Sequence, residues 1–156
     1  MNKCIIVDTR EKQKAIRPIL EYFDKAGVGH ISSKLLFGDY MDFNRPQIVI
    51  DRKQNIAELA KNVTVERARF IAEIERAQAV GSKLVILVEQ NKYKDRGRWV
   101  FVKDISDIML WSSPHTTIRG EKVFRTLSRL VYKYNISVVF CNKSETGKKI
   151  LEIIYE

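Results

Sequence analysis

Two short segments of the sequence hold carboxylates and a lysine in a combination that suits the hydrolysis of a phosphodiester bond. Asp39 lies in the first segment, and Asp51 and Lys53 lie in the second. Mg²⁺ keeps several of its waters when it binds a protein, so two carboxylates are enough to hold it. A bound ion lowers the pKa of a water and neutralises transition-state charge, and a nearby lysine can orient the attacking water. These residue types favour a hydrolase that uses Mg²⁺ or Mn²⁺.

A β-hairpin would bring the two segments together. Residues 39–43 and 47–51 read as strands, and the Asn-Arg-Pro sequence at 44–46 reads as the turn between them. This turn would place Asp39 directly opposite Asp51, with their Cβ atoms about 4.5–5.5 Å apart. A turn of another length would break the register. The alternative is an ordinary surface hairpin that carries charged side chains.

The alternation of side chains along a strand separates the two cations that follow Asp51. Lys53 shares a strand face with Asp51, whereas Arg52 points to the other face. We therefore predict that Lys53 lies beside the two carboxylates. Arg52 has two interpretations, because it either grips a phosphate or anchors the structure by pairing with an acid.

The charge balance favours a polyanionic partner. The chain has 156 residues, of which 45% are hydrophobic, and its 28 Lys and Arg against 19 Asp and Glu give a net charge of +9. This length and apolar content indicate one folded domain with a substantial core. A nucleic acid is the expected partner, since it commonly binds basic domains of this kind. The alternatives are an inert basic surface and a basic protein-interaction domain.

The sequence lacks the signals of several protein classes. No stretch approaches the ~20 apolar residues of a membrane span, and the N-terminal apolar run reaches Asp8 too soon for a secretion signal. Cys4 and Cys141 are expected too far apart for a disulfide, and no zinc-ligand spacing occurs. We therefore expect an intracellular, reducing compartment (the cytoplasm if the source is a prokaryote or a phage), no membrane and no organic cofactor.

The hydrophobic pattern predicts an α/β fold with a mixed central sheet and helices on both faces. Doubly buried strands are expected at 4–7, 84–88 and 136–140. Helices are expected around 16–23, 56–63, 64–79, 105–111, 119–134 and 145–155, with a strand at 99–102 and a basic loop, either DNA-contacting or disordered, at 91–98. Asp8 and Glu89 close two buried strands, and carboxylates at that end of α/β strands often line the functional crevice.

Four motifs, taken in order, resemble those of the XPF-type nuclease domain, which belongs to the PD-(D/E)XK, restriction-endonuclease-like superfamily. They are Val7-Asp8-Thr9-Arg10-Glu11, Gly38-Asp39-Tyr40, Ile50-Asp51-Arg52-Lys53 and Leu87-Val88-Glu89. Any one of these motifs is a weak signal, whereas the ordered set is specific. The resemblance implies a restriction-endonuclease-like fold and a single nuclease domain over residues 1–156.

The resemblance implies a metal-dependent DNA endonuclease that uses Mg²⁺ or Mn²⁺ and often cuts branched or flap DNA. Carried over by motif, the metal-binding and catalytic acids are Asp39 and Asp51 with Asp8 as an accessory acid, the catalytic lysine is Lys53, and the DNA-binding arginines are Arg10, Arg52 and Arg69. Family members often dimerise through this domain, so a homodimer is also expected. Because the family includes degenerate partners, the alternative function is a non-catalytic DNA-binding subunit or scaffold.

The sequence departs from the family pattern at three places. The family signature begins with glutamate where this chain has Asp51, which keeps a hard oxygen ligand. The aspartate that follows the signature is replaced by Ala57, with Glu58 beside it. The tandem helix–hairpin–helix module that usually follows such a nuclease domain is not expected in this chain. The sequence leaves open whether Glu11, Glu58 or Glu89 joins the site.

Overall fold

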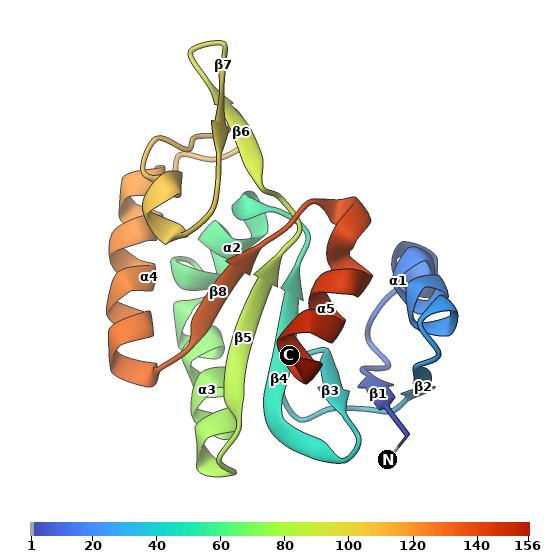
Figure 1. The fold of residues 1–156 in the computed structure, drawn as a ribbon. Coiled ribbons are helices and arrows are strands. Elements are labelled where there is room, and N and C mark those ends of the chain that lie inside the picture. The colour runs from blue at the N-terminus through green and yellow to red at the C-terminus, as the bar shows by residue number, and fades with distance from the viewer. Residues whose placement is uncertain (1) are drawn as a thin grey trace.

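A six-stranded mixed sheet forms the middle layer of the molecule, which a computed structural model describes for residues 2–156 (Figure 1). The strands are β1 (Cys4–Val7), β2 (Gly29–Ser32), β3 (Tyr40–Asp42), β4 (Arg45–Lys53), β5 (Lys83–Val88) and β8 (Ser137–Phe140). Their order is β2-β1-β3-β4-β5-β8, and all run parallel except β3, which is antiparallel to β1 and β4. The predicted mixed sheet is confirmed.

Helices cover both faces of this sheet, as the sequence predicts (Figure 1). One face carries α1 (Gln13–Lys25) and α5 (Thr146–Tyr155), and the other carries α2 (Ile56–Val63), α3 (Arg67–Ala79) and α4 (Gly120–Tyr134). In α1, Ile16, Ile19 and Phe23 recur at helical spacing and form the buried stripe that docks the helix. Side chains alternate along β4, so Val49 packs with α2, α3 and α4, whereas Ile50 packs with α1 and α5.

The carboxyl ends of the parallel strands meet at one edge of the sheet. β1, β4 and β5 all end there, so Asp8, Lys53 and Glu89 lie at the same edge. β3 runs in the opposite direction, and Asp39, which precedes it, therefore lies there as well. The topology collects acids that are far apart in the sequence, as is common at functional crevices of α/β folds.

The hairpin of β3 and β4 has the predicted register at its open end and a different turn. Tyr40 pairs with Ile50, which is the register that sets Asp39 opposite Asp51. The turn is Phe43-Asn44, shorter and earlier than predicted, because β4 already begins at the next residue. The register shifts near this turn, and extra residues of β4 form a bulge between the turn and the paired ends.

The segment predicted as a basic loop is an ordered hairpin, so that prediction is wrong. β6 (Lys92–Asp95) and β7 (Arg98–Phe101) pair antiparallel and project beyond the carboxyl edge of the main sheet (Figure 1). Arg96 and Gly97 form the turn with φ angles of 52° and 79°, as a tight two-residue hairpin turn requires. The predicted helix at 105–111 is the short 3₁₀ turn η1 (Ile105–Ile108), and η2 (Lys143–Glu145) precedes α5.

Two further features of the described chain concern disulfide bonds and helices that could span a membrane. Cys4 and Cys141 are both free thiols in the part of the chain that the structure describes. No helix among residues 2–156 is long and apolar enough to cross a membrane.

Candidate active site

A cleft of about 330 Å³ opens at the carboxyl edge of the sheet, on the side that α3 covers. It is lined by the predicted site residues Asp8, Arg10, Asp39, Asp51, Lys53 and Arg69. Three more charged residues, Glu11, Glu73 and Arg76, also line it. The cleft therefore contains five acids from four separate segments of the chain, with cations around them.

Asp51 and Lys53 project from β4 into this cleft as a buried pair. Lys53 Nζ lies 3.1 Å from Asp51 Oδ2 and 5.7 Å from the centre of the Phe70 ring on α3. Burial by itself lowers the pKa of Lys53, but the charge of Asp51, its hydrogen bond and the charges of Glu73 and Asp39 together outweigh burial and raise that pKa, so the amine stays protonated. Asp51 is only 4% exposed, and within the described chain its Oδ2 accepts no well-directed hydrogen bond. This oxygen keeps lone pairs for another ligand.

Asp39 approaches Asp51 because Gly38 allows a tight crossing before β3. Gly38 has a φ of 71°, and a Cβ at this position would lie 2.3 Å from Val49 Cγ1, so only glycine fits. The Asp39 backbone N–H donates to Ile50 O at 2.7 Å, and its Oδ2 accepts from the Arg52 backbone N–H at 2.7 Å. Burial raises the pKa of Asp39 well above its ordinary value of 3.8, and the charge of Asp51 raises it further.

Glu73 is a cleft residue that the sequence analysis did not identify. It reaches in from α3, and its Oε2 accepts from the Gly38 backbone N–H at 3.2 Å. Burial and then the charge of Asp51 raise the pKa of Glu73. Its position three residues after Phe70 places it on the inward side of α3, and that spacing was the available signal.

Asp8 also faces the cleft, but both of its carboxylate oxygens are already engaged. Oδ2 accepts from Arg10 Nε at 2.7 Å, and Oδ1 accepts from the Leu35 backbone N–H at 2.8 Å. Burial tends to raise the pKa of Asp8, but these hydrogen bonds outweigh it and lower the pKa. Asp8 therefore holds Arg10 at the rim, and the predicted metal ligation by Asp8 would require these bonds to break.

The predicted arginines Arg10 and Arg69 lie at the rim of the cleft with largely exposed side chains. Arg69 pairs with Glu66 one helical turn earlier, at 2.8 Å. Arg76, on the same helix, donates from Nε to Leu36 O at 3.2 Å. Such exposed guanidinium groups exchange partners at little cost, so they can turn toward a phosphate.

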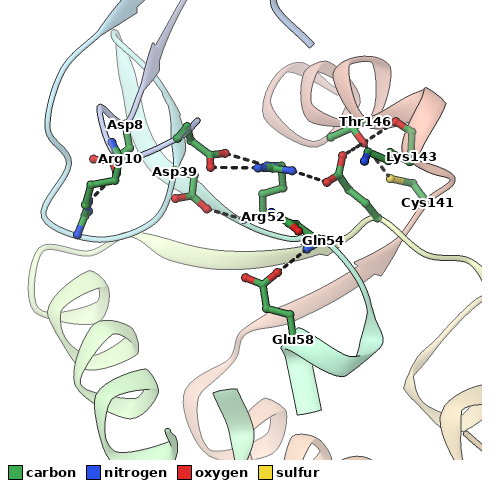
Figure 2. Close-up of polar contacts among 11 residues, drawn as sticks. Asp8, Arg10, Asp39, Arg52, Gln54, Glu58, Cys141, Lys143 and Thr146 are labelled. Atoms are coloured by element: carbon green, nitrogen blue, oxygen red, sulfur yellow. Dashed lines mark hydrogen bonds and ion pairs between the residues drawn. The ribbon is translucent and has the colours of Figure 1, made fainter. Parts of the chain in front are cut away.

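Arg52 is the predicted DNA-binding residue that lies away from the cleft. Its side chain is 5% exposed and pairs with Glu11 at 2.8 Å and with Glu89 at 2.5 Å. Glu89 in turn accepts a hydrogen bond from Thr146, the first residue of α5. Figure 2 shows this chain of contacts between Asp39, Arg52 and Thr146. Of the two interpretations of Arg52, the structure favours the structural anchor, because its guanidinium forms the core of a buried ion-pair network, and the DNA contact stays a prediction.

Of the three acids that the sequence left open, Glu11 lines the cleft and Glu89 belongs to the Arg52 network. Glu58 accepts from the Gln54 backbone N–H at 2.8 Å, and this contact, drawn in Figure 2, braces the start of α2. Glu58 is therefore a helix-capping residue with no contact to the cleft carboxylates among the described bonds.

Comparison with known proteins agrees with this geometry. The profile of the ERCC4 domain matches residues 7–153. The chain belongs to the ERCC4 domain family. The fold of this ERCC4 domain is similar to that of XPF from Aeropyrum pernix, with a TM-score of 0.67 and 18% identity over 96% of this chain and 62% of that chain.

The structure of XPF from Aeropyrum pernix in complex with DNA is equally similar to the ERCC4 domain, with a TM-score of 0.67 and 18% identity over 97% of this chain and 63% of that chain. The chain thus spans less than two thirds of the length of these structures. A comparison with curated proteins gave no match. The resemblance to the XPF-type nuclease domain and the predicted fold are both confirmed.

The cleft of this ERCC4 domain fits a hard divalent cation. Among residues 2–156, no three acid, imidazole or thiol groups form a ready-made metal cage. Mg²⁺ does not need one, since it binds through one or two carboxylates and keeps its waters. Asp39 and Glu73, whose pKa values are raised beside Asp51, mark a place where negative charge exceeds the local positive charge. Asp39 and Asp51 would hold the ion, with Glu73 close to them.

Proposed function

We propose that this ERCC4 domain is a DNA endonuclease that depends on Mg²⁺ or Mn²⁺. The observation that carries the proposal is the cleft in which Asp39, Asp51 and Glu73 crowd around a single buried lysine. A crowded group of carboxylates is costly to fold, and groups with raised pKa values, as at Asp39 and Glu73, cluster at functional sites. The exposed arginines at the rim supply the complementary charge for a phosphate backbone.

The residues divide into three tasks. A divalent ion held by Asp39 and Asp51 would supply a water of lowered pKa and charge neutralisation. Lys53, kept protonated and fixed between Asp51 and Phe70, would orient the attacking water or stabilise the charge that develops on the phosphate. Arg10 and Arg69 would hold the neighbouring phosphates in register, because their planar guanidinium groups match phosphate oxygens.

DNA is the proposed substrate for two reasons. The net charge of +9 favours a polyanion, and the similar XPF structure from Aeropyrum pernix was solved with DNA. We also propose that branched or flap DNA is preferred, in line with the family resemblance. A homodimer remains a proposal that light scattering at micromolar concentration would test.

The deciding experiment is the cleavage of labelled linear, flap, forked and four-way DNA in Mg²⁺, Mn²⁺ or EDTA. Asp51→Asn is expected to lower the cleavage rate at least about 100-fold while keeping the shape of the side chain, because a single charge-stabilising group at such a site contributes about that much. Lys53→Ala is expected to act in the same direction. Glu58→Gln is the matched control, since Glu58 caps α2 outside the cleft and its replacement keeps an acceptor oxygen.

Two results would contradict the proposal. Unchanged cleavage by a folded Asp51→Asn variant would show that the chemistry occurs elsewhere. DNA binding without cleavage in either metal, on all of these substrates, would favour the alternative function of a non-catalytic DNA-binding subunit.

A further inference from the structure

The β6–β7 hairpin has two faces of opposite character. On its inner face, Tyr93 is buried and its hydroxyl donates to Asp107 O at 2.5 Å, which fixes the hairpin to the η1 segment. The base of the hairpin is closed by the Val102 backbone N–H, which donates to Asn91 O at 2.8 Å. The hairpin is therefore a braced element of the fold, so the side chains on its other face are held in a defined arrangement.

The outer face of the hairpin carries two lysines and two exposed aromatic rings. Lys94 is directly opposite Trp99, and Lys92 is directly opposite Phe101. Trp99 is 52% exposed and Phe101 is 62% exposed. Lys92 Nζ and Lys94 Nζ lie 4.7 Å and 5.0 Å from the centre of the Trp99 ring. These cation–π contacts hold the indole and both ammonium groups together as one unit.

This outer face continues into a second hollow of about 670 Å³, separate from the catalytic cleft. The hairpin contributes Lys92, Lys94 and Trp99 to its lining, and other segments contribute His115, Asn142 and Lys143. Its floor includes residues that directly follow β4 and β5, the strands that carry the catalytic edge. An extended ligand in this hollow would thus contact the same edge of the sheet that carries the cleft.

We propose that the outer face of the β6–β7 hairpin and the adjoining hollow bind a single-stranded segment of DNA. An exposed indole offers a flat surface to a base, and the flanking lysines offer charge to the phosphates on either side, which is how sequence-independent single-strand sites are built. A base that stacks on Trp99 would release one ammonium from the ring to a phosphate. Arg96, at the tip of the turn, extends the positive strip.

The chemistry of this face favours a single strand over a duplex. Bases inside a duplex cover one another, so Trp99 has no base surface to contact there except at an end. A purely electrostatic duplex site would not need two large apolar rings in water, which are otherwise unfavourable to expose. The proposal rests on the proposed DNA endonuclease function and refines it: the preferred substrate carries a single-stranded arm that the hairpin holds beside the cut.

The test measures binding in EDTA, so that it does not depend on cleavage. The probe is fluorescent oligothymidylate, with a blunt duplex of the same length for comparison. Trp99→Ala is expected to weaken oligothymidylate binding at least about fivefold, the lower end of the loss for one base–aromatic stack. Trp99→Phe should retain most of the affinity, and duplex binding should change less than twofold. Tyr132→Ala, at an exposed aromatic ring on α4, is the control.

Two further readouts use the same probe. The chain has two tryptophans, and both Trp99 and the 4% exposed Trp111 line the hollow, so the quenching by oligothymidylate that is lost in Trp99→Phe would report on Trp99. Alanine at both Lys92 and Lys94 should reduce the slope of log binding constant against log salt concentration by about 0.7 for each phosphate contact that is lost. Lys83→Ala, at the opposite end of β5, should leave this slope unchanged.

The proposal is overturned if a folded Trp99→Ala variant binds oligothymidylate like the parent protein, or if single-strand and duplex binding weaken equally. The second result would assign the hairpin to duplex DNA. Loss of the endonuclease function is distinguishable, because it would appear as absent cleavage by the parent protein while the EDTA binding results stay as expected.

Discussion

The two faces of β4 treat charge in opposite ways. On one face, Arg52 is buried between Glu11 and Glu89, and each of these two carboxylates has the guanidinium as a close partner. On the other face, Asp51 and Lys53 form a pair into which the further carboxylates Asp39 and Glu73 crowd. Consecutive residues of a single strand thus belong to a network in which every carboxylate contacts the guanidinium and to a cluster in which, within residues 2–156, only Asp51 has an ion pair.

The difference in ion pairing indicates that the Arg52 face stabilises the fold, whereas the Asp51–Lys53 face is suited to binding and chemistry. Removing one member of a paired buried network leaves an uncompensated charge, so such a network holds elements together without gaining new ligands. A cluster that keeps carboxylates close together without enough cations lowers the stability of the fold, and this cost is typical of functional sites. Changes on the two faces should therefore shift the free energy of unfolding in opposite directions.

Arg52→Ala should have the largest effect on stability. The substitution leaves Glu89 buried without its cation, and we expect the free energy of unfolding to fall by about 3–5 kcal/mol. Urea unfolding followed by circular dichroism measures this change. The control is Arg125→Ala, which removes an exposed pair with Glu121 and should cost less than about 0.5 kcal/mol. A loss below about 1 kcal/mol for Arg52→Ala would remove the contrast between the two faces.

Thr146→Val should have an intermediate effect in the same direction. The Thr146 hydroxyl is buried and donates to Glu89 Oε2 at 2.5 Å, so valine leaves one oxygen of a buried carboxylate without a donor. We expect a loss of about 1.5–3 kcal/mol, the range for hydrogen bonds to charged groups. Thr146→Ser keeps the hydroxyl and is the matched comparison. Equal losses for the valine and serine variants would indicate that packing, not this hydrogen bond, matters.

Asp39→Asn should have the smallest effect on stability, and its sign should be reversed. The amide keeps an oxygen that can accept from the Arg52 backbone N–H but removes a charge beside Asp51. In EDTA we expect the free energy of unfolding at neutral pH to rise by about 0.5–2 kcal/mol, while cleavage is lost. A fall in stability would mean that the Asp39 charge is compensated in the folded state, and the cluster would then resemble the Arg52 network.

The pH dependence of the free energy of unfolding of Asp39→Asn tests the same cluster in a second way. The pKa of Asp39 is raised in the folded state, so that state keeps a proton at pH values where the unfolded chain has lost it. Stability therefore falls as pH rises from 3.8 through the raised pKa, and Asp39→Asn should flatten this slope. The pKa of Asp8 is lowered, so its contribution is lost only as pH falls below 3.8. Unfolding curves over a pH series in EDTA separate the two windows.

Much of the fold and part of the site could be predicted because they depend on local patterns. The buried strands, the main helices and the opposition of Asp39 to Asp51 follow from periodicity and from a strand register. The edge strand β2 was not predicted, because its residues are mostly exposed and form no apolar run. A strand at 99–102 was predicted and corresponds to β7, but β6 and its pairing with β7 were not, since the hairpin turn uses Arg96 where glycine or asparagine is favoured.

The remaining site residues depend on tertiary contacts that the sequence does not encode locally. Glu73 enters the cleft because α3 crosses above Gly38, and its spacing from Phe70 indicates an inward side chain but not this approach to Gly38. Arg52 lies in a family motif, and the motif favoured a DNA contact. The alternation of side chains along β4 instead directs Arg52 toward α5 and Glu89. Its alternation with Asp51 and Lys53 was the more reliable signal.

The bulge of β4 makes the length of the β3–β4 turn independent of the position of Asp51. Extra residues of β4 already absorb the mismatch between the Phe43-Asn44 turn and the paired ends of the strands. An insertion at this turn would enlarge an existing irregularity without sliding one strand past the other. The exposed tip at Phe43 is accordingly suited to a peptide tag or a fluorophore, a handle for following the protein that leaves the cleft residues in place.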